Sequence, residues 1–245
     1  MTAEKPGRLY ALSDLHMDGG TGKPMDIFGR VWADHVEHIR ENWMRVIRPE
    51  DRVLIAGDIS WGMYLQDVIP DLMEISSWPG EKILLRGNHD YWWSSVSRVR
   101  QVLPPGIRVI QNDALEYPDC VICGSRGWKF PGGEEELTPE DGKIYARELI
   151  RLEMSLEKAR KAAGERPILA MMHYPPLSVK VQETGFTQIL EKYGVQVCVY
   201  GHLHGYGIPA GWTGKLRGIS YHLTSADALS FCPMEIRLRV SPENM

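Results

Sequence analysis

The sequence of 245 residues has few cysteines, no long apolar run and no excess of positive charge. Its four cysteines are few for this length and suggest no dense disulfide framework. No stretch approaches the roughly 18 consecutive apolar residues of a membrane span. The N-terminus lacks the charged start and long apolar region of a signal peptide. We therefore expect no membrane partner, and a reducing cytoplasm is the simplest compartment.

The charge balance is slightly acidic, with 28 Lys and Arg against 32 Asp and Glu and a net charge of -4. No global positive field would attract a polyanion, so we expect no duplex nucleic-acid partner. The 43% of hydrophobic and 24% of charged residues are ordinary for a soluble globular protein. Because no Ser/Gly-rich or Pro-rich linker divides the chain, we expect a single domain over residues 1–245. The oligomeric state stays open.

Short runs of Val, Ile and Leu alternate with longer stretches of helical period. The runs predict buried strands at 8–14, 52–58, 82–90, 167–173 and 195–204. The stretches between them predict helices at 31–47, 66–77, 94–103, 139–163 and 187–193. This alternation predicts a layered α/β fold. Residues 107–124 and 216–239 resemble consecutive strands and turns, which predicts added antiparallel pairing.

Polar residues follow each predicted strand, where ligands collect in open α/β sheets. The runs are SDLH (13–16), GDIS (57–60), GNHD (87–90), MMHY (171–174) and GHLH (201–204). They supply carboxylates, imidazoles and one amide, with no thiolate. Such donors suit divalent metals of intermediate hardness, such as Mn, Fe, Zn, Co or Ni. The set holds more ligands than one metal needs.

Together the five runs resemble the calcineurin-like metallophosphoesterase superfamily, whose pattern is D-x-H, G-D, G-N-H-[DE], a lone His and G-H-x-H. All five elements stand in that order between Asp14 and His204. The resemblance implies an αββα fold, a layered β-sandwich flanked by helices. It also implies two divalent or mixed-valence metal ions of the Mn, Fe, Zn, Co or Ni class at the sheet edge.

The resemblance implies a role for each motif residue. The ligands of one metal would be Asp14, His16, Asp58 and His204. Those of the other would be Asp58, Asn88, His173 and His202, so that Asp58 bridges the pair. His89 would protonate the leaving oxygen, and Asp90 would orient the His89 ring.

The second and third motifs narrow the substrate class. Protein phosphatases of this superfamily carry G-D-x-V-D-R-G and a third motif ending in Glu, whereas this chain has GDISWG and Asp90. The sequence is more similar to the branch of phosphodiesterases and small-molecule phosphohydrolases. We predict hydrolysis of a small-molecule or nucleotide phosphodiester by in-line attack of a metal-bridging hydroxide. The alternatives are a phosphomonoesterase or Ser/Thr protein phosphatase-like activity and, more distantly, a non-catalytic scaffold, against which the full motif set argues.

Arg126 and Tyr174 are candidate substrate-binding residues. Arg126 could grip a phosphate oxygen with two hydrogen bonds, or could form a structural salt bridge; Lys129 is a weaker candidate. Many aromatic residues stand near the motifs and could line a pocket, but packing of loops onto the sheet is favoured for most of them.

Four other features are predicted to carry no chemistry. Cys120 and Cys123 stand in one predicted strand, whose alternation points their two sulfurs to opposite faces. Because no second cysteine pair completes a zinc site, both are favoured as core thiols. The run GGTGKP has Pro24 where a phosphate loop needs Ser or Thr. CGSRG lacks the first glycine of a nucleophile elbow. His35 and His38, on a charged helix, are predicted to lie on its solvated face.

Overall fold

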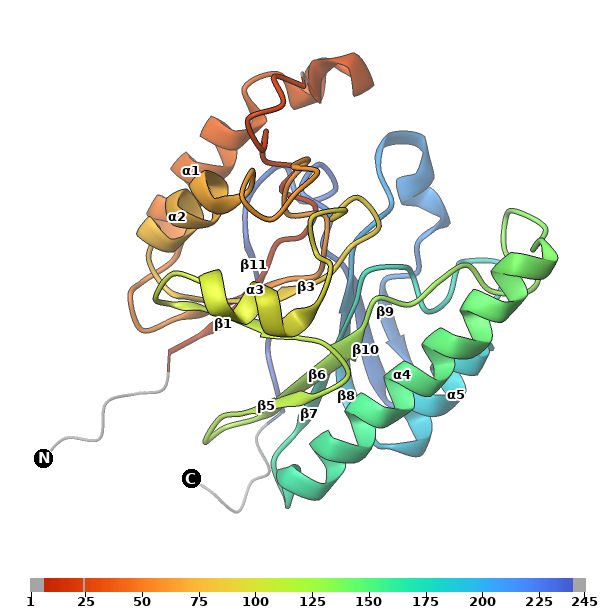
Figure 1. Cartoon of the computed structure of the whole chain (residues 1–245). Helices are drawn as coiled ribbons and strands as arrows, with labels where there is room; N and C mark the ends of the chain where they lie inside the picture. Colours follow the sequence, from red (N-terminus) through yellow and green to blue (C-terminus); the bar gives the residue numbers. More distant parts are fainter. Residues whose placement is uncertain (1–6, 24, 240–245) are drawn as a thin grey trace, which may run out of the picture. The chain divides into compact units, whose positions relative to one another are not determined.

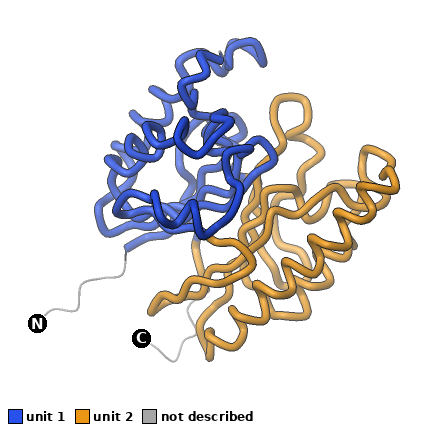
Figure 2. The backbone as a smooth tube through the Cα atoms, viewed as in Figure 1, with its two compact units in different colours: residues 1–109, 224–236 blue, residues 110–223, 237–245 orange. Residues whose placement is uncertain are grey.

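The computed structural model describes residues 7–23 and 25–239. Pro24 and both ends of the predicted 1–245 domain lie outside this part of the chain. The chain divides into two compact units, Met1–Val109 with Thr224–Ile236 and Ile110–Leu223 with Arg237–Met245, drawn in blue and orange in Figure 2. Among the described residues, no helix is long and apolar enough to cross a membrane.

The first unit is built on a sheet whose strands follow the order β11-β1-β2-β3-β4; β1, β3 and β11 are labelled in Figure 1. The strands are Leu9–Ala11 (β1), Arg52–Ile55 (β2), Glu81–Leu85 (β3), Ile107–Ile110 (β4) and Met234–Glu235 (β11). β1, β2 and β3 pair in parallel, and β11 pairs antiparallel with β1. Parallel strands end at the same edge of a sheet, so the loops after β1, β2 and β3 come together there.

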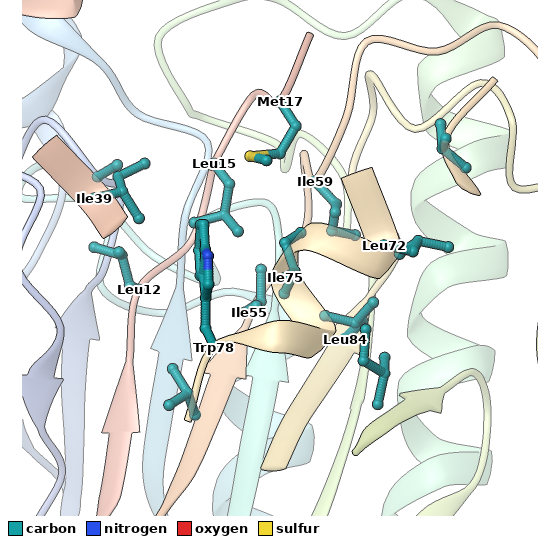
Figure 3. Close-up of a cluster of buried hydrophobic side chains, with 14 of the residues drawn as sticks. Leu12, Leu15, Met17, Ile39, Ile55, Ile59, Leu72, Ile75, Trp78 and Leu84 are labelled. Atoms are coloured by element: carbon teal, nitrogen blue, oxygen red, sulfur yellow. The ribbon is translucent and has the colours of Figure 1, made fainter. Parts of the chain in front are cut away.

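The helices of the first unit pack on this sheet through one apolar cluster (Figure 3). They are His35–Val46 (α1), Ile69–Ser77 (α2) and Val96–Val102 (α3), with the short 3-10 turns Met25–Phe28 (η1) and Arg30–Trp32 (η2) before α1. Ile39 of α1 and Ile75 of α2 are fully buried in the cluster with Ile55 of β2. Burial of each such side chain stabilises the fold by about 1.5–3 kcal/mol. The packed helices thereby hold the sheet in place, together with the edge that carries the motifs.

The second unit contains a sheet with the order β5-β6-β7-β8-β10-β9. The strands are Ala114–Glu116 (β5), Val121–Ser125 (β6), Ile168–Met172 (β7), Val195–Tyr200 (β8), Gly214–Leu216 (β9) and Ile219–Leu223 (β10). β6, β7, β8 and β10 run parallel, while β5 and β9 pair antiparallel at the two edges. The helices Pro139–Ala163 (α4) and Gly185–Lys192 (α5) pack on it, and Gly205–Ala210 (η3) follows β8.

The predicted α/β fold, with two mixed sheets and flanking helices, is confirmed. α4 spans the predicted residues 139–163, and its start is fixed by the Thr138 capping box. The predicted antiparallel pairing is present in β5–β6, β9–β10 and β1–β11. The helix predicted over 31–47 begins only at His35, because Asp34 has a left-handed backbone (φ 51°) that separates α1 from η2. A single domain over 1–245 stays a prediction.

The four cysteines, all within the described residues, are free thiols. Cys120, Cys123 and Cys198 are fully buried in the second unit. Burial raises the pKa of the Cys123 and Cys198 thiols, which disfavours the reactive thiolate. The prediction that Cys120 and Cys123 are core thiols is confirmed.

Lys82 of β3 is a buried lysine, with only 1% of its surface exposed. Its Nζ donates to the carbonyl oxygens of Ser76, at 3.3 Å, and of Trp78, at the end of α2. Burial lowers the pKa of Lys82 from 10.5 to about 8, because the ammonium loses its water. Between these two pH values the unfolded chain binds more protons at this group than the folded chain does.

The contribution of Lys82 to the free energy of unfolding should therefore rise with pH between about 8 and 10.5. Lys82→Met removes this titration. The free energy of unfolding of the variant, relative to that of the parent protein, should therefore fall over the same pH range, by at most about 3 kcal/mol. Urea unfolding at several pH values measures the difference. Lys143→Met, at an exposed position of α4, is the control. A stability difference for Lys82→Met that stays constant with pH would contradict the prediction.

Candidate active site

Three motif residues of the first unit lie buried at the ends of neighbouring strands. Asp14 and His16 follow β1, Asp58 follows β2, and they are 0%, 4% and 2% exposed. All three have left-handed backbones, with φ of 60°, 46° and 51°. Such conformations cost non-glycine residues about 1–3 kcal/mol each and persist where the surroundings hold them, often at functional sites. Here Asp14 N donates to Gly57 O and His16 N to Asp58 O, which ties the two loops together.

The polar groups of these three residues are close together. Asp14 offers an oxygen within 4.8 Å of a ligand atom of His16 and of Asp58. His16 Nε2 lies 3.9 Å from Asp58 Oδ2. Two carboxylates that are buried from solvent and this close together repel each other unless a cation compensates their negative charge. Carboxylates and imidazole without a thiolate are a donor set that fits a divalent metal ion.

Gly87 lets the loop after β3 approach this group. A Cβ at Gly87 would lie 2.1 Å from Asp58 Oδ1 and 2.2 Å from Asp58 N, so a larger residue cannot occupy the position. The approach places His89 N 2.8 Å from Asp58 Oδ1, to which it donates. Asn88 stands between Gly87 and His89 in the same loop and is half-buried. The first unit thus brings its predicted site residues into one group.

Asp90 is a fully buried carboxylate that joins the loops after β2 and β3. Its Oδ2 accepts from Gly87 N at 2.7 Å and Asp58 N at 3.0 Å. Its Oδ1 accepts from Ile59 N, Ser60 N and Trp92 Nε1 at 2.9–3.3 Å. These bonds fix the backbone of Asp58, a function that the motif did not predict. The predicted orientation of the His89 ring by Asp90 stays a prediction.

Trp61 lies against two of the motif imidazoles. Its ring stacks on His16, with centroids 4.9 Å apart and planes at 19°, and its centroid lies 4.6 Å from that of His89. Trp92 and Trp93 are instead fully buried in the core of the first unit, as the packing prediction for most aromatic residues expects.

The predicted solvated position is wrong for His35 and confirmed for His38, which is exposed. His35 is buried, and its Nε2 lies 3.1 Å from the carbonyl oxygens of both Leu15 and His16. Carbonyl oxygens only accept, so Nε2 carries a proton and donates to the loop that holds His16. Burial lowers the pKa of His35. The overlooked signal was helical spacing, since His35, Ile39 and Trp43 share one buried face of α1.

The motif histidines of the second unit follow adjacent parallel strands. His173 follows β7 and is fully buried, while His202 and His204 follow β8 and are half-buried. The rings of His173 and His202 lie 5.1 Å apart at 74°. His173 N donates to Arg126 O, and Gly201 N donates to His173 O, which fixes the three loops to each other. His202 also has a left-handed backbone, with φ of 75°.

Arg126 and Tyr174 lie beside these histidines in the second unit. The Tyr174 ring is 4.1 Å from that of His202 and 4.9 Å from that of Trp128. Arg126 Nη2 lies 3.7 Å from an oxygen of Glu148, a buried carboxylate, so the predicted salt bridge is present. The guanidinium also lies 4.7 Å from the centroid of Trp128. A contact between Arg126 and a substrate phosphate stays a prediction.

Comparison with known proteins identifies the family. A family model described as calcineurin-like phosphoesterase matches residues 7–206. The chain belongs to the calcineurin-like phosphoesterase family. The predicted family and its enzyme class, a metal-dependent phosphohydrolase, are therefore confirmed.

Two solved structures resemble this phosphoesterase across nearly its whole length. The phosphopantetheinyl hydrolase of Mycobacterium tuberculosis has a TM-score of 0.58 and 14% identity, covering 97% of this chain and 99% of that one. A protein of unknown function from Aquifex aeolicus has a TM-score of 0.49 and 17% identity, covering 94% and 95%. At 14% identity, the first likeness is one of fold. No curated protein matches the sequence.

Proposed function

We propose that this phosphoesterase is a dinuclear metal-dependent hydrolase that acts on a small-molecule or nucleotide phosphodiester. The observation that carries the proposal is the buried group of Asp14, His16 and Asp58, held in three left-handed backbone positions. A protein that strains its backbone to bring two carboxylates and an imidazole together gains from it only when a cation binds them. Membership of the phosphoesterase family supports the choice of a metal ion.

The proposed ligands follow the family motifs. Those of one ion are Asp14, His16, Asp58 and His204, and those of the other are Asp58, Asn88, His173 and His202. The histidines of the second unit are assigned as metal ligands from the motif pattern alone. Two ions of the Mn, Fe, Zn, Co or Ni class would neutralise phosphate oxygens and lower the pKa of a bound water.

His89 is the proposed general acid that gives a proton to the leaving oxygen. Its backbone amide is fixed to Asp58 Oδ1, and its ring lies against Trp61, so both ends of the residue are positioned. Asp90 acts on this chemistry through the backbone, because it holds Asp58 and Gly87 in place. The chain thus supplies the acid and its support from two adjacent loops.

The substrate class follows from a missing charge. A monoester brings two negative charges, which protein phosphatases balance in part with an arginine of the second motif, and GDISWG has none. We expect the Mn-loaded enzyme to have a higher kcat/KM on bis-p-nitrophenyl phosphate than on p-nitrophenyl phosphate, and phosphopeptides to be poor substrates. Steady-state kinetics on the three substrates decides this. A clear monoester preference would show that another cation replaces the arginine.

A monoesterase is the second candidate because one such cation is present. Lys23 Nζ lies 3.5 Å from the centroid of Trp61, the ring that packs on His16 and His89. If the enzyme prefers monoesters, Lys23→Met should lower kcat/KM on p-nitrophenyl phosphate and leave bis-p-nitrophenyl phosphate little changed. Equal effects on both esters would remove Lys23 from that function.

A metal-reconstituted activity screen tests the proposal as a whole. The same protein sample is loaded with each candidate metal, analysed for metal content and assayed on monoesters and diesters. Two bound ions with diester turnover support the proposal, whereas two bound ions without turnover on any phosphoester favour a non-catalytic scaffold. The cytoplasmic location stays a prediction.

A further inference from the structure

A cavity of about 150 Å³ lies beside His202 in the second unit. The residues that line it are mainly aromatic and aliphatic, and include Trp128, Phe130, Tyr174, Leu177, Leu203 and Ala210. They come from the loops after β6, β7 and β8 and from η3, at the sheet edge where His173 and His202 also lie. The cavity therefore adjoins one of the proposed metal ligands.

The aromatic walls are held in place by other contacts. Trp128 Nε1 donates to Asp141 Oδ1 at 2.9 Å, and the Arg126 guanidinium lies 4.7 Å from the Trp128 ring centroid. Tyr174 is buried, and its amide donates to Arg126 O at 2.9 Å. Walls fixed in this way need little reordering when a ligand enters, which favours binding.

The charged side chains around the cavity are one lysine and two glutamates. Lys129 contributes to the lining but pairs with Glu135, which also lines the cavity and holds the pKa of Lys129 above its usual range. Glu134 adds a further acidic side chain. The cavity thus has no excess of positive charge for a phosphate, and its apolar walls fit an uncharged group.

We propose that this cavity binds a ring-sized, apolar part of the substrate, an aryl group on the alcohol side of the phosphoester. An apolar cavity of about 150 Å³ is the size that holds one benzene ring. Trp128, Phe130 and Tyr174 offer ring faces and edges for offset or edge-to-face packing. This inference rests on the proposed function and narrows its substrate class to aryl-bearing esters.

Binding of two phosphonates tests the inference without a reaction. In phenylphosphonate the ring is bonded directly to phosphorus and stands in for an aryl group on the ester oxygen. Methylphosphonate carries the same phosphonate head with a small apolar group, and neither compound has a leaving group whose reactivity could enter. Calorimetric titration of the Mn-loaded protein should give a Kd about 10- to 100-fold lower for phenylphosphonate, the range expected for burying one aromatic ring. Equal affinities would overturn the inference.

Two variants locate the effect in the cavity. Ala210→Leu fills part of the space and should abolish most of the phenyl preference while methylphosphonate binding stays unchanged. Phe130→Leu keeps an apolar wall without the ring and should lower phenylphosphonate affinity several-fold. Ala146→Leu, at an exposed position of α4, is the matched control and should keep the preference. A phenyl preference that survives Ala210→Leu in a folded protein would place the aryl group elsewhere and overturn the inference.

The outcomes separate this inference from the proposed function. Diester turnover without a phenyl preference keeps the hydrolase proposal and overturns the aryl site. A phenyl preference that Ala210→Leu removes, in a protein without turnover on any phosphoester, keeps the aryl site and overturns the hydrolase proposal.

Discussion

Asp58→Asn is expected to lower metal occupancy at both proposed positions at once. The amide oxygen of Asn can still accept the hydrogen bond from His89 N, which is 2.8 Å from Asp58 Oδ1, so the loop should keep its place. The substitution removes the negative charge, and it should weaken both sites because Asp58 is the proposed ligand of both ions. Metal content per chain, measured by elemental analysis after equilibration at ordinary metal concentration, should fall well below two. His16→Ala should reduce mainly one of the two.

Asp71→Asn is the matched control for this experiment. Asp71 is also a buried carboxylate of the first unit, and it accepts from Gly19 N and Ser60 Oγ. It stands outside the metal motifs, so its variant should keep the metal content of the parent protein. Full two-metal occupancy in Asp58→Asn, with Asp71→Asn unchanged, would remove Asp58 from the bridging position.

Sequence pattern predicted the parts of the fold that depend on neighbours in the chain. The apolar runs placed β2, β3, β7 and β8, and the helical period with a cap placed α4 over 139–163. The boundary at Asp34 was missed because a left-handed aspartate has no local signal comparable to that of glycine. His35 is buried although charged residues surround it in the sequence, because its spacing from Ile39 and Trp43 places it on the buried face of α1.

The chemistry of the site was visible in the motifs, but its support was not. Asp90 was expected to act on the residue beside it, and it holds the backbone of Asp58 and Ile59, about 30 positions away. Which backbone amides meet a buried carboxylate depends on how two strands pair, and that register is a tertiary property. The cavity beside His202 also depends on tertiary structure, because its walls come from separate loops.

His89→Ala is expected to keep the metal ions and to lose about 10²–10⁴-fold in turnover on esters with poor leaving groups, the usual range for a general acid. Metal binding should survive because the contact of His89 with Asp58 is made by the backbone amide, which the substitution leaves in place. With nitrophenolate as the leaving group the loss should shrink, since that group departs with little protonation. His38→Ala removes an exposed imidazole of the same unit and should change neither metal content nor turnover. Equal losses on good and poor leaving groups, with metal content intact, would assign His89 to positioning of the phosphate and leave the proton to another donor.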